Sequence, residues 1–224
     1  MLKDQHIIYS HVTGESVFIN DMPADDRLLT GHVFYSRVAH GRIISLDITE
    51  ARKVAGVYAI LTARDIPGEN QMGPVIKDEP ILAETEVTFI GQAIALIAAD
   101  NEEAAREAEK LIRLEMEPLE AILDIETAIA RNNKIPGIKP ITCGNAKAVM
   151  ENAPHRLSGE LRTGAQEHWY LETQTALAIP GEGNEIKLYA STQHPSETQT
   201  IVANALGIQK SDVEVEVRRL GGAF

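Results

Sequence analysis

The sequence predicts a mixed α/β (α+β) protein built in two parts. Up to about residue 120, short runs rich in β-branched and aromatic residues alternate with segments of helical periodicity. After a Pro- and Gly-containing stretch at 132–140, the pattern changes to a helix followed by several strands. An apolar fraction of 44% with 24% charged residues is ordinary globular composition. We therefore place the boundary near residues 130–143, between domains at 1–135 and 140–224.

Charge and cysteine content exclude several classes of protein. The 21 basic and 33 acidic residues give a net charge of −12, which argues against a nucleic-acid-binding surface. A single cysteine, Cys143, excludes an internal disulfide framework and any Cys-x-x-Cys metal site, and it fits a reducing compartment. The longest apolar run, 93–99, is far shorter than the roughly 20 residues needed to span a bilayer. We expect a cytoplasmic protein that contacts neither nucleic acid nor membrane.

The first part is predicted to hold several strands. Segments 32–38 and 42–48 are expected to be paired strands, and 56–61 another strand. A short strand near 16–19 and a short helix at 49–53 are also expected. The run 93–99 is apolar throughout, which fits a strand covered on both faces.

A helix is predicted to follow this apolar strand. Asp100 is expected to cap it, with Glu103 in the capping-box position. An apolar stripe at helical spacing indicates that this helix packs on the preceding strand; its members are Ala104, Ala105, Ala108 and Leu111.

The second part is predicted to be richer in strands. Helices are expected at 124–131, 145–152 and 199–206, the last ending at Gly207. Strands are expected at 156–162, 173–179, 185–191 and 213–217, with a hairpin turn at 181–184.

Three segments carry groups that chemistry could use. Residues 166–172 gather two carboxylates, an imidazole, a carboxamide and the only tryptophan; alternatively, Trp169 and Tyr170 anchor a core. Residues 191–197 join a strand to a helix; alternatively, Ser196 caps that helix and Gln193 closes a turn. The third segment, 220–224, has two glycines after a strand, which allow main-chain N–H groups to approach a ligand or simply form a turn.

Other chemistry finds little support in the sequence. The histidines show no metal-ligand spacing, and Cys143 has no neighbouring base in sequence to activate a thiolate. There is no P-loop and no complete Gly-x-Gly-x-x-Gly nucleotide fingerprint.

Taken in order, segments 165–172, 191–197 and 217–224 resemble the molybdenum-binding portion of xanthine dehydrogenases, in the xanthine oxidase and aldehyde oxidase family. The earlier chain agrees through motifs at 12–21, 37–41, 63–68 and 89–92. The resemblance runs from about residue 12 to the last residue. It implies a hammerhead α/β domain followed by the start of a molybdopterin-binding domain.

The resemblance also implies specific cofactor contacts. Gln193 matches the family glutamine whose carboxamide lies beside the oxygen ligands of molybdenum, where a neutral donor adds no charge. Phe224 matches the residue whose main chain contacts the metal centre, and Gly221 and Gly222 permit that approach. The implied cofactor-binding residues are therefore Gln193, Gly222 and Phe224, with Gln193 and Phe224 beside the metal. No catalytic residue is assigned, and Glu167 and His168 are given a supporting structural role.

The resemblance further implies an oxidoreductase that works with partners. Members of the family oxidise purines or aldehydes with oxygen derived from water, and electrons leave through iron–sulfur clusters and usually FAD. The single cysteine forbids a 2Fe–2S cluster on this chain, so the clusters and FAD are expected on partner chains. In the family the Gly-rich loop continues beyond the phenylalanine, and the catalytic base, the substrate arginine and most pterin contacts follow it, whereas this sequence stops at Phe224.

We therefore expect an amino-terminal fragment or split subunit of a xanthine dehydrogenase-like molybdenum hydroxylase that oxidises purines. It should be inactive alone and should work with the remaining molybdenum-binding polypeptide. Two alternatives stay open: an aldehyde-oxidising relative, and a non-catalytic binding or assembly module that kept the hammerhead fold.

Overall fold

The chain is described here by a computed structural model that covers residues 9–23, 25–134, 140–170, 172 and 174–223. It contains both helices and sheets, as predicted, and divides into two compact units, residues 1–120 with 169–224 and residues 121–168. The strands are β1 (Thr30–Tyr35), β2 (Gly41–Asp47), β3 (Val57–Thr62), β4 (Glu86–Val87), β5 (Ala93–Ala99), β6 (Arg113–Pro118), β7 (Ala176–Pro180), β8 (Ile186–Ala190) and β9 (Val213–Glu216). The helices are α2 (Glu102–Leu111), α3 (Ile125–Ala130), α4 (Ala146–Asn152) and α5 (Pro195–Leu206).

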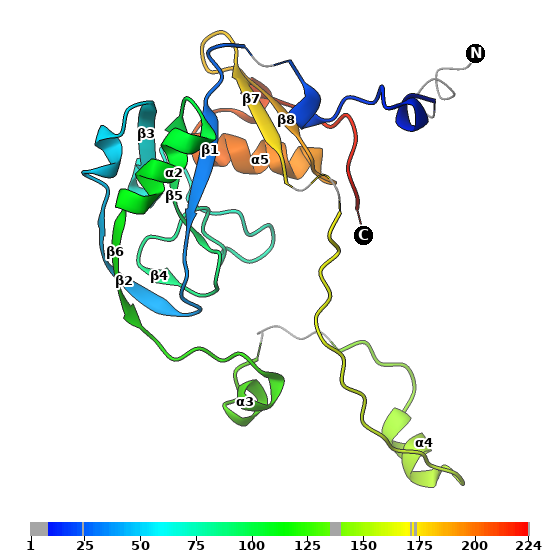
Figure 1. The fold of residues 1–224 in the computed structure, drawn as a ribbon. Coiled ribbons are helices and arrows are strands. Elements are labelled where there is room, and N and C mark those ends of the chain that lie inside the picture. The colour runs from blue at the N-terminus through cyan, green and yellow to red at the C-terminus, as the bar shows by residue number, and fades with distance from the viewer. Residues whose placement is uncertain (1–8, 24, 135–139, 171, 173, 224) are drawn as a thin grey trace. The chain divides into compact units, whose positions relative to one another are not determined.

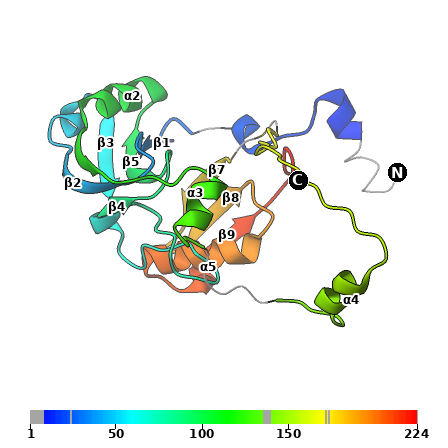
Figure 2. The same cartoon turned by 90° about the horizontal axis from the view of Figure 1, so that it is seen from below.

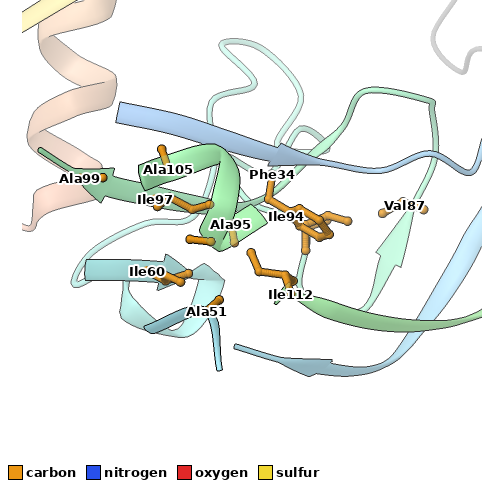
Figure 3. Packing of buried hydrophobic residues seen from close by; sticks show 12 residues of the cluster. Phe34, Ala51, Ile60, Val87, Ile94, Ala95, Ile97, Ala99, Ala105 and Ile112 are labelled. Carbon is orange, nitrogen blue, oxygen red and sulfur yellow. The ribbon is translucent and has the colours of Figure 1, made fainter. Parts of the chain in front are cut away.

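The apolar strand β5 lies at the centre of the first sheet, in the order β1-β5-β3. Its side chains Ile97 and Ala99 join Ala105 and Ala108 of α2 in one buried cluster, which Figure 3 shows from close by. Helix α2 packs against this sheet (Figure 2). The prediction of a buried strand with the following helix packed on it is confirmed.

The prediction that 32–38 and 42–48 pair with each other is wrong. β1 pairs with β5, whereas β2 lies between β4 and β6 in a second sheet. Both strands find their partners far along the chain. Short apolar runs of similar composition can pair in several ways, so closeness in sequence does not specify the partner.

Several predicted ends of elements also differ. Asn101, not Asp100, caps α2, since its side-chain oxygen accepts from the N–H of Ala104. The main-chain N–H of Asp100 instead donates to the carbonyl of Gly56, which holds Asp100 outside the helix. Segments 19–21 and 51–53 are single 3₁₀ turns rather than a strand and a helix.

In the 121–168 unit the structure contains the two predicted helices but not the predicted strand. Helix α3 is capped by Asp124 and α4 by Asn145, close to the predicted bounds. The predicted strand at 156–162 is wrong, since these residues are exposed and lie in no sheet. A strand needs a neighbour to satisfy its main-chain groups, and 156–162 pair with no strand of the three sheets in the described residues.

The third sheet, whose strands β7 and β8 are labelled in Figure 1, has the order β7-β8-β9, and α5 packs against β9. β7 and β8 form the predicted hairpin, and β8 and β9 run parallel with α5 in the connection between them. Helix α5 starts at Pro195, earlier than the predicted residue 199, and ends as predicted at Gly207, which has φ of 67°. Proline suits the first helical position because its missing N–H would have no partner there.

The last turn of α5 is held by the loop that follows β3. The N–H groups of Gly68 and Glu69 donate to the carbonyls of Ala205 and Asn204, both at 2.9 Å. The last carbonyls of a helix lack the usual partner four residues on, so this loop satisfies them. A Cβ at position 68 would overlap the carbonyl oxygen of Asn204, which explains the glycine.

His40 joins the start of β2 to two neighbouring segments of the second sheet. Its Nδ1 donates to the main-chain carbonyl of Glu120 at 2.7 Å, and its Nε2 donates to the Glu86 carboxylate at 2.9 Å. Both ring nitrogens donate only in the imidazolium form. The hydrogen bonds to Glu120 and then to Glu86 therefore raise the pKa of His40 above its usual value.

A raised histidine pKa makes part of the stability depend on pH. The contribution of His40 is fully present below the usual histidine pKa of about 6.5 and is lost as pH rises through the raised value. We predict that the wild-type chain loses stability relative to His40→Asn as pH rises from about 6 to about 8. Urea unfolding across this range measures the difference, and a constant difference would contradict the prediction. His155→Asn, at an exposed position after α4, is the control and should track the wild type.

Candidate functional site

The parallel pairing of β8 with β9 brings two of the motif segments to one edge of the third sheet. Ile186 aligns with Val213 and Tyr189 with Glu216. Because the carboxyl ends of neighbouring parallel strands meet at the same edge, the segments that follow Ala190 and Glu216 start side by side. In open sheets, ligands bind outside this carboxyl edge. One segment is the Gln193 turn, residues 191–194, and the other is the Gly-rich loop, residues 217–223.

The Gln193 turn is fixed by its neighbours on both sides. The N–H of Ser191 donates to the carbonyl of Thr175 at 3.0 Å. The hydroxyl of Thr192 accepts from the N–H of His194 at 3.1 Å and from the hydroxyl of Thr198 at 3.2 Å. The alternative that Ser196 caps the helix is wrong, because α5 has already begun at Pro195.

Gln193 itself is exposed, and within the described part of the chain no hydrogen bond holds its carboxamide. It lies between the end of β8 and the first turn of α5. A neutral side chain here can donate to an oxygen atom of a ligand without adding charge.

The Gly-rich loop passes close to a third motif residue, Glu172. A Cβ at position 221 would overlap the main-chain nitrogen of Glu172, so only glycine allows this approach. Gly222 is half-buried in the same loop. The predicted metal contact at Phe224 lies outside the described residues.

The two arginines at the start of the loop are already engaged by protein groups. Arg218 donates to Glu216 at 3.0 Å, which raises the pKa of Arg218, and it lies over the ring of Tyr189. Arg219 donates to the carbonyl of Val17 at 2.6 Å and lies over the ring of Phe18. Their guanidinium groups hold the loop to the sheet and to the amino-terminal segment.

The residues of segment 166–172 differ in exposure and in their contacts. Glu167 and His168 are exposed, and Trp169 is 87% exposed with φ of 51°, so Trp169 does not anchor a core in this chain. Glu172 is half-buried, accepting from the hydroxyl of Ser191 at 2.9 Å and from the N–H of Ile19 at 3.2 Å. Sequence reasoning missed this role of Glu172, since its partners lie 19 and 153 positions away.

Neither a cluster of metal ligands nor a membrane-spanning helix occurs in the described residues. No group of three or more His, Cys, Asp or Glu side chains in the described ranges lies close enough together to hold a metal ion. Among the helices in the described part of the chain, none is long and apolar enough to cross a membrane.

Two family models match the chain. The hammerhead domain of aldehyde oxidase and xanthine dehydrogenase matches residues 13–120, and the molybdopterin cofactor-binding domain matches residues 128–224. A hammerhead domain is thus followed by the start of a cofactor-binding domain, as the sequence motifs predicted. The chain belongs to the aldehyde oxidase and xanthine dehydrogenase family.

Curated relatives agree with this assignment. Xanthine dehydrogenase of Dictyostelium discoideum is 40% identical over 213 residues, which are 95% of this chain and 16% of the relative. Aldehyde oxidase 2 of Cavia porcellus is 38% identical over 216 residues, which are 96% of this chain and 16% of the relative. The chain therefore spans only 16% of the length of these relatives, and the two identities are nearly equal.

Solved structures share the fold. Quinoline 2-oxidoreductase from Pseudomonas putida 86 matches with a TM-score of 0.80 at 24% identity, covering 97% of this chain and 30% of that one. Aldehyde oxidoreductase from Desulfovibrio gigas matches with a TM-score of 0.81 at 24% identity, covering 96% of this chain and 26% of that one.

The contact between Gly221 and Glu172 predicts the effect of adding one methyl group. Gly221→Ala should destabilise the chain by about 1–3 kcal/mol, because the loop must move away from the Glu172 main chain. Urea unfolding monitored by circular dichroism measures this change. Gly159→Ala is the matched control, since no atom lies within 4 Å of a Cβ there. Equal stability of the two variants would show that the close approach is not present in solution.

Proposed function

We propose that this chain is the amino-terminal part of a molybdenum hydroxylase that oxidises purines with oxygen derived from water. The observation that carries the proposal is the carboxyl edge of β8 and β9. The exposed carboxamide of Gln193 and the Gly-rich loop both follow strands that end at this edge. Family membership supports a molybdopterin cofactor as its ligand.

The residues present at this edge fit such a group. Gln193 offers an accessible neutral donor, which suits the oxygen ligands of a metal centre. The glycines of the loop leave its main chain without side chains between it and a ligand. The two arginines of the loop are engaged by protein groups, Arg218 by the Glu216 carboxylate and Arg219 by the main-chain carbonyl of Val17.

Each residue then has a distinct part in binding. Gln193 would donate from Nε2 to an oxygen ligand of the cofactor, and Gly222 and Phe224 would supply main-chain contacts from the loop. When bound, the cofactor supplies the redox centre that accepts the electrons removed from the substrate. In this proposal the chain's own groups bind and orient the cofactor, and no described residue is assigned the role of catalytic acid or base.

We infer that activity needs a further polypeptide. We place the two domains of this chain at residues 1–135 and 140–224. Several large apolar side chains of the 121–168 unit are strongly exposed, as expected if a further polypeptide covers them. They include Leu123 at 79%, Ile141 at 101%, Leu157 at 100% and Leu161 at 89% exposure. We propose that the remaining molybdenum-binding polypeptide covers these side chains. The 2Fe–2S clusters and FAD would lie on further chains or domains, and the assembly would work in the cytoplasm.

The substrate class rests on the motif segments. Segments 166–172 and 191–197 look most like those of xanthine dehydrogenases, so we favour a purine over an aldehyde. The similarity to a xanthine dehydrogenase and to an aldehyde oxidase at nearly equal identity leaves this choice to experiment.

The test is to purify the chain together with the polypeptide that completes its cofactor-binding domain. We predict molybdenum and pterin in the assembly and dye reduction that depends on xanthine. Gln193→Ala should lower this rate on the order of a hundredfold while the metal content is kept, because the hydrogen bond that orients an oxygen ligand of the cofactor is lost.

Gln209→Ala is the matched control, because Gln209 is exposed beyond the opposite end of α5, and it should keep the wild-type rate. Dye reduction with aldehydes but not xanthine would replace the purine assignment with the aldehyde one. An intact assembly without molybdenum and pterin would reject the enzyme and leave the non-catalytic module.

A further inference from the structure

Glu172 lies where the Gln193 turn, the Gly-rich loop and the amino-terminal segment meet. One carboxylate oxygen accepts from the hydroxyl of Ser191 at 2.9 Å, on the Gln193 turn. The other accepts from the N–H of Ile19 at 3.2 Å. The main chain of Glu172 lies so close to Gly221 that any side chain there would overlap it. One residue therefore contacts all three segments.

The contacts of Glu172 use its whole carboxylate. Both oxygens accept, and the two donors come from different parts of the chain, so the side chain joins segments that no local structure joins. The amino-terminal segment is held a second time, because Arg219 donates to Val17 and lies over the ring of Phe18. The Gly-rich loop is thus related to Glu172 in two ways: Gly221 packs closely on the Glu172 main chain, and Arg219 of the loop binds the same amino-terminal segment whose Ile19 N–H donates to the Glu172 carboxylate.

We propose that Glu172 is a positioning residue that fixes the Gly-rich loop relative to the Gln193 turn before the cofactor binds. The role in cofactor binding rests on the proposed function, whereas the contacts that hold the loop and the turn are those of this chain alone. Without the Glu172 side chain, the loop and the turn would still follow their strands, but nothing at position 172 would link the turn to the amino-terminal segment. A loop held in one conformation binds its ligand without first losing conformational freedom.

The hydrogen bonds, rather than the charge, carry this role. A glutamine at 172 can keep both contacts, with Oε1 accepting from the N–H of Ile19 and Nε2 donating to the Ser191 oxygen. An alanine keeps neither. Glu172→Gln should therefore retain the wild-type behaviour that Glu172→Ala loses, and Ser191→Ala should show part of the loss.

The first measurement is hydrogen exchange in the full chain, which needs no cofactor. In Glu172→Ala, we expect the amide of Ile19 and the amides of 217–223 to exchange about tenfold faster, while those of β5 stay unchanged. Glu172→Gln should remain within about threefold of the wild type. Glu182→Ala, in the exposed β7–β8 turn, is the control and should change nothing at these amides. Unchanged exchange at 217–223 in Glu172→Ala would overturn the proposal.

The second measurement separates positioning from mere stability. In the purified assembly, we expect Glu172→Ala to alter the electron paramagnetic resonance signal of the bound molybdenum, and Glu172→Gln to restore the wild-type signal. Faster exchange with an unaltered signal would make Glu172 a purely structural residue and overturn its positioning role. A wild-type assembly without molybdenum would reject the proposed function, while the exchange result would still decide whether Glu172 holds the loop.

Discussion

The parallel pairing between β8 and β9 is the constraint on which the candidate site depends. The Gln193 turn follows β8 and the Gly-rich loop follows β9. Helix α5 lies between the two segments in the sequence. Main-chain hydrogen bonds set the register of the two strands and bring the starting points of both segments to one sheet edge. Helix α5 connects the strands, and the loop after β3 holds its last turn in place.

Contacts across long stretches of sequence complete the site. Glu172 and Arg219 both reach the amino-terminal segment, over separations of 153 and 202 positions. The early part of the chain therefore contributes directly to the site, because residues 17–19 take part in holding the Gly-rich loop. These contacts agree with the division of the chain, in which one compact unit contains both the third sheet and residues 1–120.

Local patterns in the sequence predicted the elements better than their contacts. The apolar run of β5 and the stripe on α2 were sufficient, because burial of one face leaves a clear periodicity. The pairing of β1 with β5 was not predictable, since several strands offer similar partners. The motif resemblance implies cofactor contacts at Gln193 and the Gly-rich loop, which stay predictions. It did not reveal the contacts of Glu172, because hydrogen bonds between distant segments leave no local pattern. The contact at Phe224 lies outside the described residues and stays a prediction.

A structure of the assembled domain with its cofactor tests the central claim most directly. We predict that the carboxamide of Gln193 and the main chain of Gly222 contact the same bound molybdopterin group, at the carboxyl edge of β8 and β9. A cofactor bound at another edge, or a Gln193 side chain turned away from it, would contradict the account.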